Sequence, residues 1–458
     1  MSTPEDTSPQ FDLQKLRKQL EPGLSGLGLH PTDTFHNDFP GAPGGPRASL
    51  VRPPGFLRPP TDNVELVSLT RYPDGVLRWD LGGIAVPAAY KLGRAGRAAL
   101  PQGEVIRQFA FERIEHNKIG DALSKLDQEL SPQRGLRFWK DGQLSPFTGS
   151  DAAGRRILLF IHGTFSNCDH LFDQLGKTPA SPGFQMLMAA ANSGKYDHIL
   201  TFDHATVGVS PAINAFDLAA LLRPAPASVD IVCHSRGGLV TRWFLEGFAD
   251  PAMKRRAVMV GATLGGTSLA APYRLRSTIN YLANIGEILG RLAGMAVLHP
   301  FLVAAGGLVR IVSSITKLVS NSPALDAAIA MIPGLAGQSR VGNNSEILSL
   351  QQNTGGAGQT YFAVTSDFRP RDPGWNFLEY FSKPIQRAAG YGADLIFEKP
   401  NDLVVETESM VQLASNPEPD GIRIQEIMPF GTNSEIHHTN YFLQKKTIDF
   451  IREKFVIN

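Results

Sequence analysis

A serine in the middle of the chain stands between an apolar, strand-like run and a helical pattern. Ser235 follows the run at residues 229–232 and precedes Arg236-Gly237-Gly238. A nucleophilic serine on a sharp strand-to-helix turn needs small residues two positions before and two positions after it, because the two elements approach closely there. Gly237 meets this need, and Cys233 offers a small side chain where a glycine is usual. Ser235 is therefore the candidate nucleophile for attack on an ester-like carbonyl, and the alternative is a turn without catalytic meaning.

The oxyanion formed in such an attack needs backbone amide donors beside the serine. Upstream, the apolar run at 158–161 leads into His162-Gly163-Thr164-Phe165, where the backbone must turn and expose its amides. We expect the N–H groups of Thr164 and of Arg236, the residue after the serine, to form the oxyanion hole. Phe165 is the alternative to Thr164, and a His-Gly pair after a strand also occurs in ordinary turns.

A serine hydroxyl needs a general base, which a carboxylate must orient. Two histidines, His437 and His438, stand just before the last helical pattern, and we prefer His438 because it lies nearer that helix. For the acid we prefer Asp402, which opens the apolar run at 403–405. Asp367 is the rival because it directly follows a strand-like run, and either aspartate also suits a simple Asx turn.

The elements that must position these residues alternate as parallel βαβ units. Continuous Val, Ile and Leu runs, typical of strands covered on both faces, lie at 157–161, 199–202, 229–232 and 257–260. Helical patterns separate them at 182–191, 213–222 and 239–248. The segment at about 268–340 is helical in pattern and unusually apolar, and it interrupts the strand series before residues 361–364 resume it. It has the position of a cap, and a helix at about 441–454 closes the chain.

The N-terminal third has a different composition. Residues 1–60 are rich in Pro and Gly, and we expect them to be largely disordered. Within them, residues 11–20 have one apolar helical face, which either packs on the protein's own body or docks on a protein partner. Residues 61–150 contain turn-bounded runs at 75–79 and 136–142, which predict a β-hairpin-containing extension packed on the core. The catalytic domain then spans residues 151–458.

Composition bears on several function classes. There are 44 Lys and Arg residues against 43 Asp and Glu residues, so the formal charge of +1 provides no field for binding nucleic acid. Two cysteines are too few for a disulfide framework, and no metal or nucleotide motif is evident in the sequence, so we expect no cofactor and no metal. The polar start has no secretory pattern, and the apolar stretch 295–309 is shorter than the ~20 residues of a spanning helix. A cytoplasmic location is expected, with signal-independent export as the alternative.

From about residue 155 to residue 458 the chain resembles the lipase/esterase branch of the α/β-hydrolase superfamily. The matching segments are 161–164, the turn at Ser235, 261–267, 401–405 and His438. The third of these is similar to the T-P-x-x-G-[ST] turn of such lipases, with Ala262-Thr263 in place of Thr-Pro. The resemblance implies a mostly parallel sheet flanked by helices, a triad in the order Ser, Asp, His, and an acyl-enzyme mechanism. Cys233 departs from the usual G-x-S-x-G pattern.

These observations predict a serine hydrolase that cleaves carboxylic esters, with an apolar acyl chain covered by the cap at 268–340. One alternative is a phospholipase that acts at membranes as a toxin or defence effector and contacts lipid through this cap. Another is a pseudo-hydrolase that binds a partner through the fold and the N-terminal segment. His204 ends a strand at the same sheet edge, and we interpret it as structural rather than catalytic.

Overall fold

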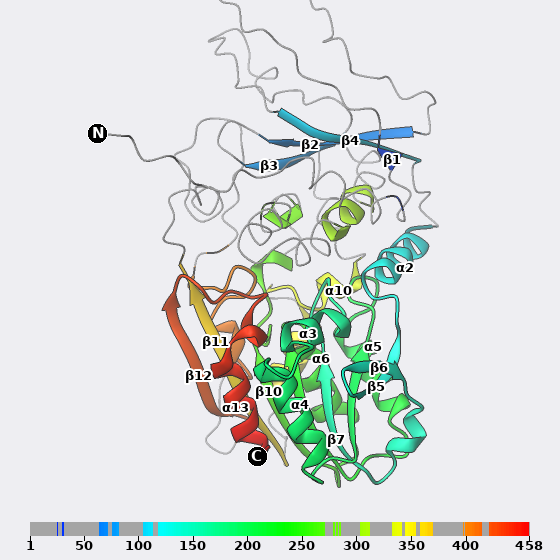
Figure 1. Cartoon of the computed structure of the whole chain (residues 1–458). Coiled ribbons are helices and arrows are strands. Elements are labelled where there is room, and N and C mark those ends of the chain that lie inside the picture. Colours follow the sequence, from blue (N-terminus) through cyan, green and yellow to red (C-terminus); the bar gives the residue numbers. More distant parts are fainter. Residues whose placement is uncertain are drawn as a thin grey trace, which may run out of the picture. The chain divides into compact units, whose positions relative to one another are not determined.

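The structure is a computed structural model of the 458-residue chain (Figure 1). It describes residues 25, 30–31, 64–71, 76–81, 104–112, 118–270, 278–279, 281–282, 284, 303–311, 332–340, 344–353, 358–369, 397, 399–414 and 421–457. The predicted helix at 11–20 and much of the predicted cap lie outside these residues. The chain divides into two units. A small unit contains Met1–Ala122, Arg276–Asn321 and Asn376–Asp394, and a large unit contains Leu123–Leu275, Ser322–Trp375 and Leu395–Asn458.

The small unit combines N-terminal strands with part of the insertion that follows residue 275. Its antiparallel sheet has the order β1-β4-β2-β3. The strands are β1 (His30–Pro31), β2 (Val64–Arg71), β3 (Leu77–Leu81) and β4 (Glu104–Glu112). Asn284, from the insertion, accepts a hydrogen bond from the Leu77 amide and donates one to the Leu77 carbonyl, both at 2.8 Å. The insertion is therefore joined to the N-terminal hairpin that the turn signals at 75–79 predict.

The large unit is built on an eight-stranded sheet of order β12-β11-β10-β9-β7-β8-β5-β6. Its strands are β5 (Gly135–Lys140), β6 (Gln143–Pro146), β7 (Arg156–Ile161), β8 (His198–Asp203), β9 (Ser228–His234), β10 (Lys254–Val260), β11 (Gln359–Phe368) and β12 (Ile424–Asn433). The six strands from β7 to β12 pair in parallel. The β5–β6 hairpin pairs antiparallel with β8, so the hairpin expected at 136–142 is the edge of the main sheet.

The helices include α2 (Ile119–Leu130), α3 (Cys168–Leu175), α4 (Pro182–Asn192), α5 (Pro211–Leu221), α6 (Gly237–Trp243), α10 (Pro333–Ala336), α11 (Ser345–Gln352) and α13 (Lys445–Phe455). Residues 303–311 are also helical. A π-helical turn extends α6 at Phe244–Phe248, and short 3-10 helices lie at Gly149–Ala152, Ser268–Ala270, Ser409–Val411 and Tyr441–Leu443. No helix in the described part of the chain has the length and apolarity needed to cross a bilayer.

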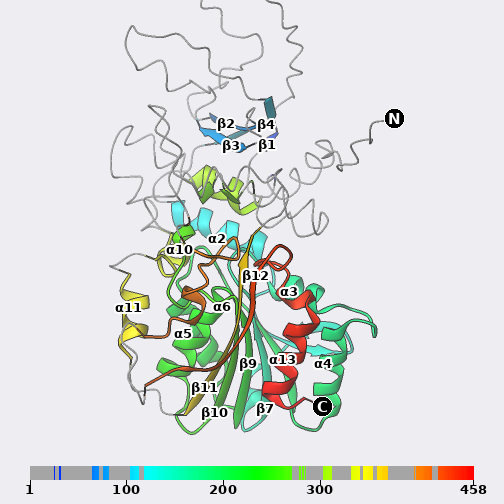
Figure 2. The same cartoon turned by 90° about the vertical axis from the view of Figure 1, so that its left-hand side faces the viewer.

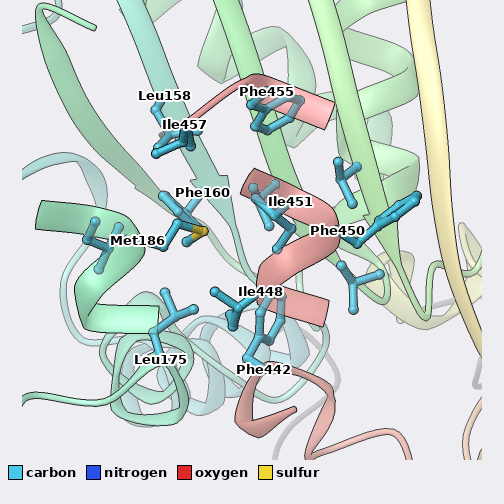
Figure 3. Packing of buried hydrophobic residues seen from close by; sticks show 14 of the residues in the cluster. Leu158, Phe160, Leu175, Met186, Phe442, Ile448, Phe450, Ile451, Phe455 and Ile457 are labelled. Atoms are coloured by element: carbon cyan, nitrogen blue, oxygen red, sulfur yellow. The ribbon is translucent and has the colours of Figure 1, made fainter. Parts of the chain in front are cut away.

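Alternate residues of β7 enter two separate hydrophobic clusters. Leu158 and Phe160 pack with α3, α4 and α13, and Figure 3 shows these two residues beside the apolar face of α13. Ile157, Leu159 and Ile161 pack with α5 and α6 on the other face. Figure 2 accordingly shows the sheet between α5 on one side and α4 and α13 on the other. Both faces are covered, which is why the strands are apolar without alternation.

The sheet order and the strand-turn-helix after β9 are those of the α/β-hydrolase fold, so the predicted fold class is confirmed. The segment 268–340, predicted as a cap, lies between β10 and β11; its residues 276–321 belong to the small unit, and the rest, with α10, belongs to the large unit. The carboxyl ends of the parallel strands lie at one edge of such a sheet, where ligands bind in open α/β folds.

Candidate active site

Ser235 occupies a strained turn between β9, which ends at His234, and α6, which begins at Gly237. Its φ is +55°, a left-handed value that non-glycine residues rarely adopt. The turn is held by its own backbone: the Ser235 amide donates to the Val260 carbonyl at 3.0 Å, and the Ser235 carbonyl accepts from the Thr263 amide at 3.2 Å. A strained turn that is held in this way by backbone hydrogen bonds presents its side chain at the end of a strand.

Small residues permit the close approach that the sequence pattern predicts. A Cβ at Gly237 would lie 2.7 Å from the carbonyl oxygen of Ile161, and a Cβ at Gly163 would lie 2.7 Å from the Cβ of Ser235. The loop after β7 therefore packs directly against the serine. Cys233 is fully buried, with Sγ 3.1 Å from Sδ of Met259, so its small side chain fits where a glycine is usual.

The backbone amides of Thr164 and Arg236, beside Ser235, have no hydrogen-bond acceptor among the described residues. The Phe165 amide, in contrast, donates to Thr206 Oγ1 at 3.3 Å. The side chain of Thr164 is held by Gln338, whose Oε1 accepts from Thr164 Oγ1 at 2.9 Å. Of the Thr164 and Phe165 amides only that of Thr164 is unpaired, which favours Thr164 over Phe165 as the hydrogen-bond donor to an oxyanion.

Asp402 and His438 form a buried pair. His438 Nδ1 lies 2.8 Å from Asp402 Oδ2, and the His438 amide donates to the Asp402 carbonyl at 2.9 Å. Asp402 Oδ1 accepts from the amides of Val404 and Val405 at 3.1 and 2.9 Å. Burial alone raises the pKa of Asp402, but His438 and these two amides outweigh it and lower this pKa below its ordinary value. Asp402 therefore remains an anion that orients the imidazole.

Two further side chains contact this pair, and sequence reasoning missed both. The Tyr441 hydroxyl donates to Asp402 Oδ2 at 2.9 Å. His234 Nε2 donates to the His438 carbonyl at 2.8 Å, and the two imidazole centroids are 4.6 Å apart. Burial, and then the proximity of His438, lower the pKa of His234 to about 3, so His234 is neutral. The position of His234 inside the serine motif is a sequence signal for it, whereas nothing in the local pattern marks Tyr441.

The rival acid and base are hydrogen-bonded elsewhere. Asp367 Oδ2 accepts from Thr432 Oγ1 at 2.8 Å. His437 Nδ1 lies 3.1 Å from Thr439 Oγ1, and burial lowers the pKa of His437 to about 4. The structure thus brings Asp402 and His438 together and joins neither rival to them.

A buried polar network contacts both chain segments that carry the Thr164 and Arg236 amides, through His162 in the first and Arg236 itself in the second. His162 Nδ1 donates to the Gly163 carbonyl at 2.9 Å, and His162 Nε2 accepts from the His204 amide at 3.1 Å. The two imidazoles stack with centroids 4.1 Å apart. Arg236 Nη1 donates to His204 Nδ1 at 3.1 Å, and Arg236 Nη2 donates to Asn214 Oδ1 at 2.8 Å. Burial lowers the pKa of Arg236 to about 10. His204 is part of this network, and its Nε2 is buried without a hydrogen-bond partner among the described residues.

Three buried side chains near this network have the spacing of metal ligands. The ligand atoms of His162, Cys168 and Asp203 all lie within 4.8 Å of one another. All three side chains are already engaged. His162 Nε2 accepts from the His204 amide, and the Cys168 thiol donates to the Phe202 carbonyl at 3.5 Å. Asp203 accepts from the Cys168 amide at 2.8 Å and from Arg137 Nε at 2.9 Å. Because Arg137 already neutralises Asp203, the cluster suits an internal network better than a cation.

A family model described as Domain of unknown function (DUF7379) matches residues 131–456. No curated protein matches the chain. The chain is similar to lipase 1 from Pelosinus fermentans, with 14% identity and a TM-score of 0.42 over 66% of this chain and 98% of that one.

Two other solved structures also align with the chain. The mature lipase BlEst2 of Bacillus licheniformis aligns with 13% identity and a TM-score of 0.36, over 66% of this chain and 92% of that one. The naproxen esterase of Bacillus subtilis aligns with 14% identity and a TM-score of 0.32, over 75% of this chain and 99% of that one. The fold assignment rests on the strand order and on the turn at Ser235 rather than on these alignments.

Proposed function

Because the chain belongs to the family described as a domain of unknown function (DUF7379), we propose its activity from its own side chains: it is a serine hydrolase that cleaves carboxylic esters through an acyl-serine intermediate. The observation that carries the proposal is the buried Asp402–His438 pair, which His234 joins to the strained turn of Ser235. Nucleophile, acid and base follow one another along the chain in the order Ser, Asp, His, which α/β-hydrolases share.

In the proposed reaction, His438 Nε2 takes the proton from Ser235 Oγ as the oxygen attacks the ester carbonyl carbon. Asp402 stays ionised and holds the Nδ1 proton, which fixes the tautomer of His438. The amides of Thr164 and Arg236 stabilise the negative charge on the carbonyl oxygen. The carbon–oxygen bond to the leaving alcohol then breaks, and the alcohol takes the proton from His438.

The second half of the reaction returns the free enzyme. A water molecule gives its proton to His438 Nε2 and attacks the acyl-serine carbonyl, and the same two amides stabilise the second tetrahedral intermediate. The bond to Ser235 Oγ then breaks, Oγ recovers its proton from His438, and the acid leaves. Apart from the ester and this water molecule, the groups in these steps are the chain's own residues.

We further propose that the acyl part of the substrate is apolar. The support is compositional, because the insertion at 268–340 is rich in apolar residues and a cap over an acyl chain must present apolar surface to it.

Hydrolysis of p-nitrophenyl esters with acyl chains from two to sixteen carbons tests the proposal. We expect kcat/KM to rise with chain length, to vanish in His438→Ala, and to survive in the matched variant His437→Ala. Folded wild-type protein that hydrolyses none of these esters contradicts the function and favours the pseudo-hydrolase alternative. Turnover confined to phospholipid vesicles points instead to the phospholipase alternative.

A further inference from the structure

The carboxylate of Asp402 accepts a hydrogen bond that the reaction above does not use. The Tyr441 hydroxyl lies 2.9 Å from Oδ2, the oxygen that also faces His438 Nδ1 at 2.8 Å. Tyr441 and Asp402 are both fully buried. A hydrogen bond to a charged, desolvated carboxylate is among the stronger ones in proteins, so this contact affects the ionised state of the pair.

The position of Tyr441 is built by the surrounding chain. Tyr441 begins the 3-10 helix three residues after His438, and the two rings are nearly perpendicular, with centroids 6.5 Å apart. On the other side, Gly261 adopts a φ of +52°, and a Cβ there would lie 2.7 Å from the Tyr441 ring and 3.3 Å from Asp402 Oδ2. A residue larger than glycine at 261 would therefore displace the phenol from the carboxylate.

We propose that Tyr441 positions the Asp402 carboxylate and weakens its attraction for protonated His438, so that His438 remains an unprotonated base at lower pH. This inference rests on the proposed function. A neutral donor on Oδ2 stabilises the carboxylate by itself and leaves less negative charge on the oxygen that faces His438 Nδ1. The stabilisation that Asp402 gives to the imidazolium is correspondingly smaller.

The ionisable groups around Asp402 and His438 are consistent with a weaker attraction of Asp402 for protonated His438. Burial, and then the charge of Asp402, raise the pKa of Tyr441 well above its ordinary value, so the phenol stays a donor through the neutral range. Among the described residues, the other titratable groups that face Asp402 are His438, His437 and His234, and burial lowers the pKa of both His437 and His234. With those two histidines neutral, Tyr441 is the side chain in the described part of the chain that competes with His438 for the carboxylate.

The test measures how fast a fluorophosphonate probe labels the protein as a function of pH, since labelling requires unprotonated His438 but no known substrate. Tyr441→Phe keeps the ring and removes the hydroxyl. In this variant we expect the acidic limb of the pH–rate profile for labelling to move to higher pH by about 0.5 to 1 unit. Tyr361→Phe is the matched control, because Tyr361 is also fully buried and donates to a carboxylate, Glu246 Oε1, at 2.8 Å. Its limb should coincide with that of the wild type.

A Tyr441→Phe limb that coincides with the wild-type limb, or that moves to lower pH, overturns the inference. A purely structural role would lower the yield or the unfolding midpoint of both variants without moving either limb. If Tyr441→Phe does not fold, Gly261→Ala, which displaces the ring, should show the same upward shift, and an unmoved limb there also overturns the inference. Wild-type protein that fails to label at any pH contradicts the proposed function instead, so the two failures are distinguishable.

Discussion

The imidazole of His234 donates a hydrogen bond of 2.8 Å to the backbone oxygen of His438, a residue 204 positions later in the chain. The same ring packs against the ring of His438 at a centroid distance of 4.6 Å. Because Ser235 directly follows His234, this contact ties the end of β9 to the loop before α13. The residue before the candidate nucleophile therefore sets where the candidate base lies.

Replacing His234 by Phe keeps an aromatic face against His438 and removes the hydrogen bond to its backbone. We predict that kcat/KM for an ester substrate falls by about 10- to 100-fold, mostly in kcat, because a base displaced by a fraction of an ångström loses its reactive geometry. His198→Phe is the control, since His198 lies at the start of β8 and packs on Phe138 and Phe147. Equal losses in the two variants would show that the effect is not specific to the site.

Asp402→Asn and Asp367→Asn separate the two acids that the sequence offers. Asp402 contacts His438, whereas Asp367 contacts Thr432, so we predict a loss of turnover of up to ~10⁴ in the first variant and little change in the second. Circular dichroism checks that both variants fold. The reverse pattern of turnover would assign the role of acid to Asp367.

Gly163→Ala tests the packing of the loop after β7. The added Cβ would meet the Ser235 Cβ at 2.7 Å, so the loop must shift and carry the Thr164 amide away from the oxyanion. We predict a kcat lower by about 10²- to 10³-fold, the size of the loss of one oxyanion donor, with a KM close to that of the wild type. Gly120→Ala, where nothing lies within 4 Å of the added atom, is the control. A Gly163→Ala enzyme with wild-type kcat would exclude Thr164 as a donor.

Buried histidines make stability depend on pH. Burial lowers the pKa of His162 and of His437 to about 4, and burial followed by the proximity of His438 lowers that of His234 to about 3. In the unfolded chain each pKa is about 6.5, so below that pH the unfolded state binds protons that the folded state excludes. This contribution to stability is complete above pH ~6.5 and is lost as the pH falls towards about 4.

We therefore predict that the urea midpoint of unfolding decreases between about pH 7.5 and about pH 4.5, and that His437→Gln, which removes one of these buried histidines, makes the decrease smaller. A midpoint with the same pH dependence in His437→Gln and wild type would show that His437 is protonated equally in both states.

The fold could be predicted because its signals are local. Continuous apolar runs at 157–161 and 229–232 predict covered parallel strands, and they lie in β7 and β9. The turn at Ser235 follows from the small residues around it. The division into two units had no local signal, because it depends on Asn284 meeting Leu77 from 207 positions away.

The site was harder to predict because its contacts are long-range. Asp402 and Asp367 both stand near strand ends, and spacing alone cannot separate them. What separates them is the turn in which Asp402 accepts two amides while its second oxygen faces His438. Tyr441 was hard to predict for the same reason, because its role depends on the left-handed backbone of Gly261, which leaves room for the phenol.

The most direct test of the central claim is mass spectrometry of the protein after reaction with a fluorophosphonate. We predict a single covalent adduct on the peptide that contains Ser235, no adduct in Ser235→Ala, and strongly slowed labelling in Asp402→Asn. Folded wild-type protein that forms no adduct, or an adduct that persists in Ser235→Ala, would contradict the central claim.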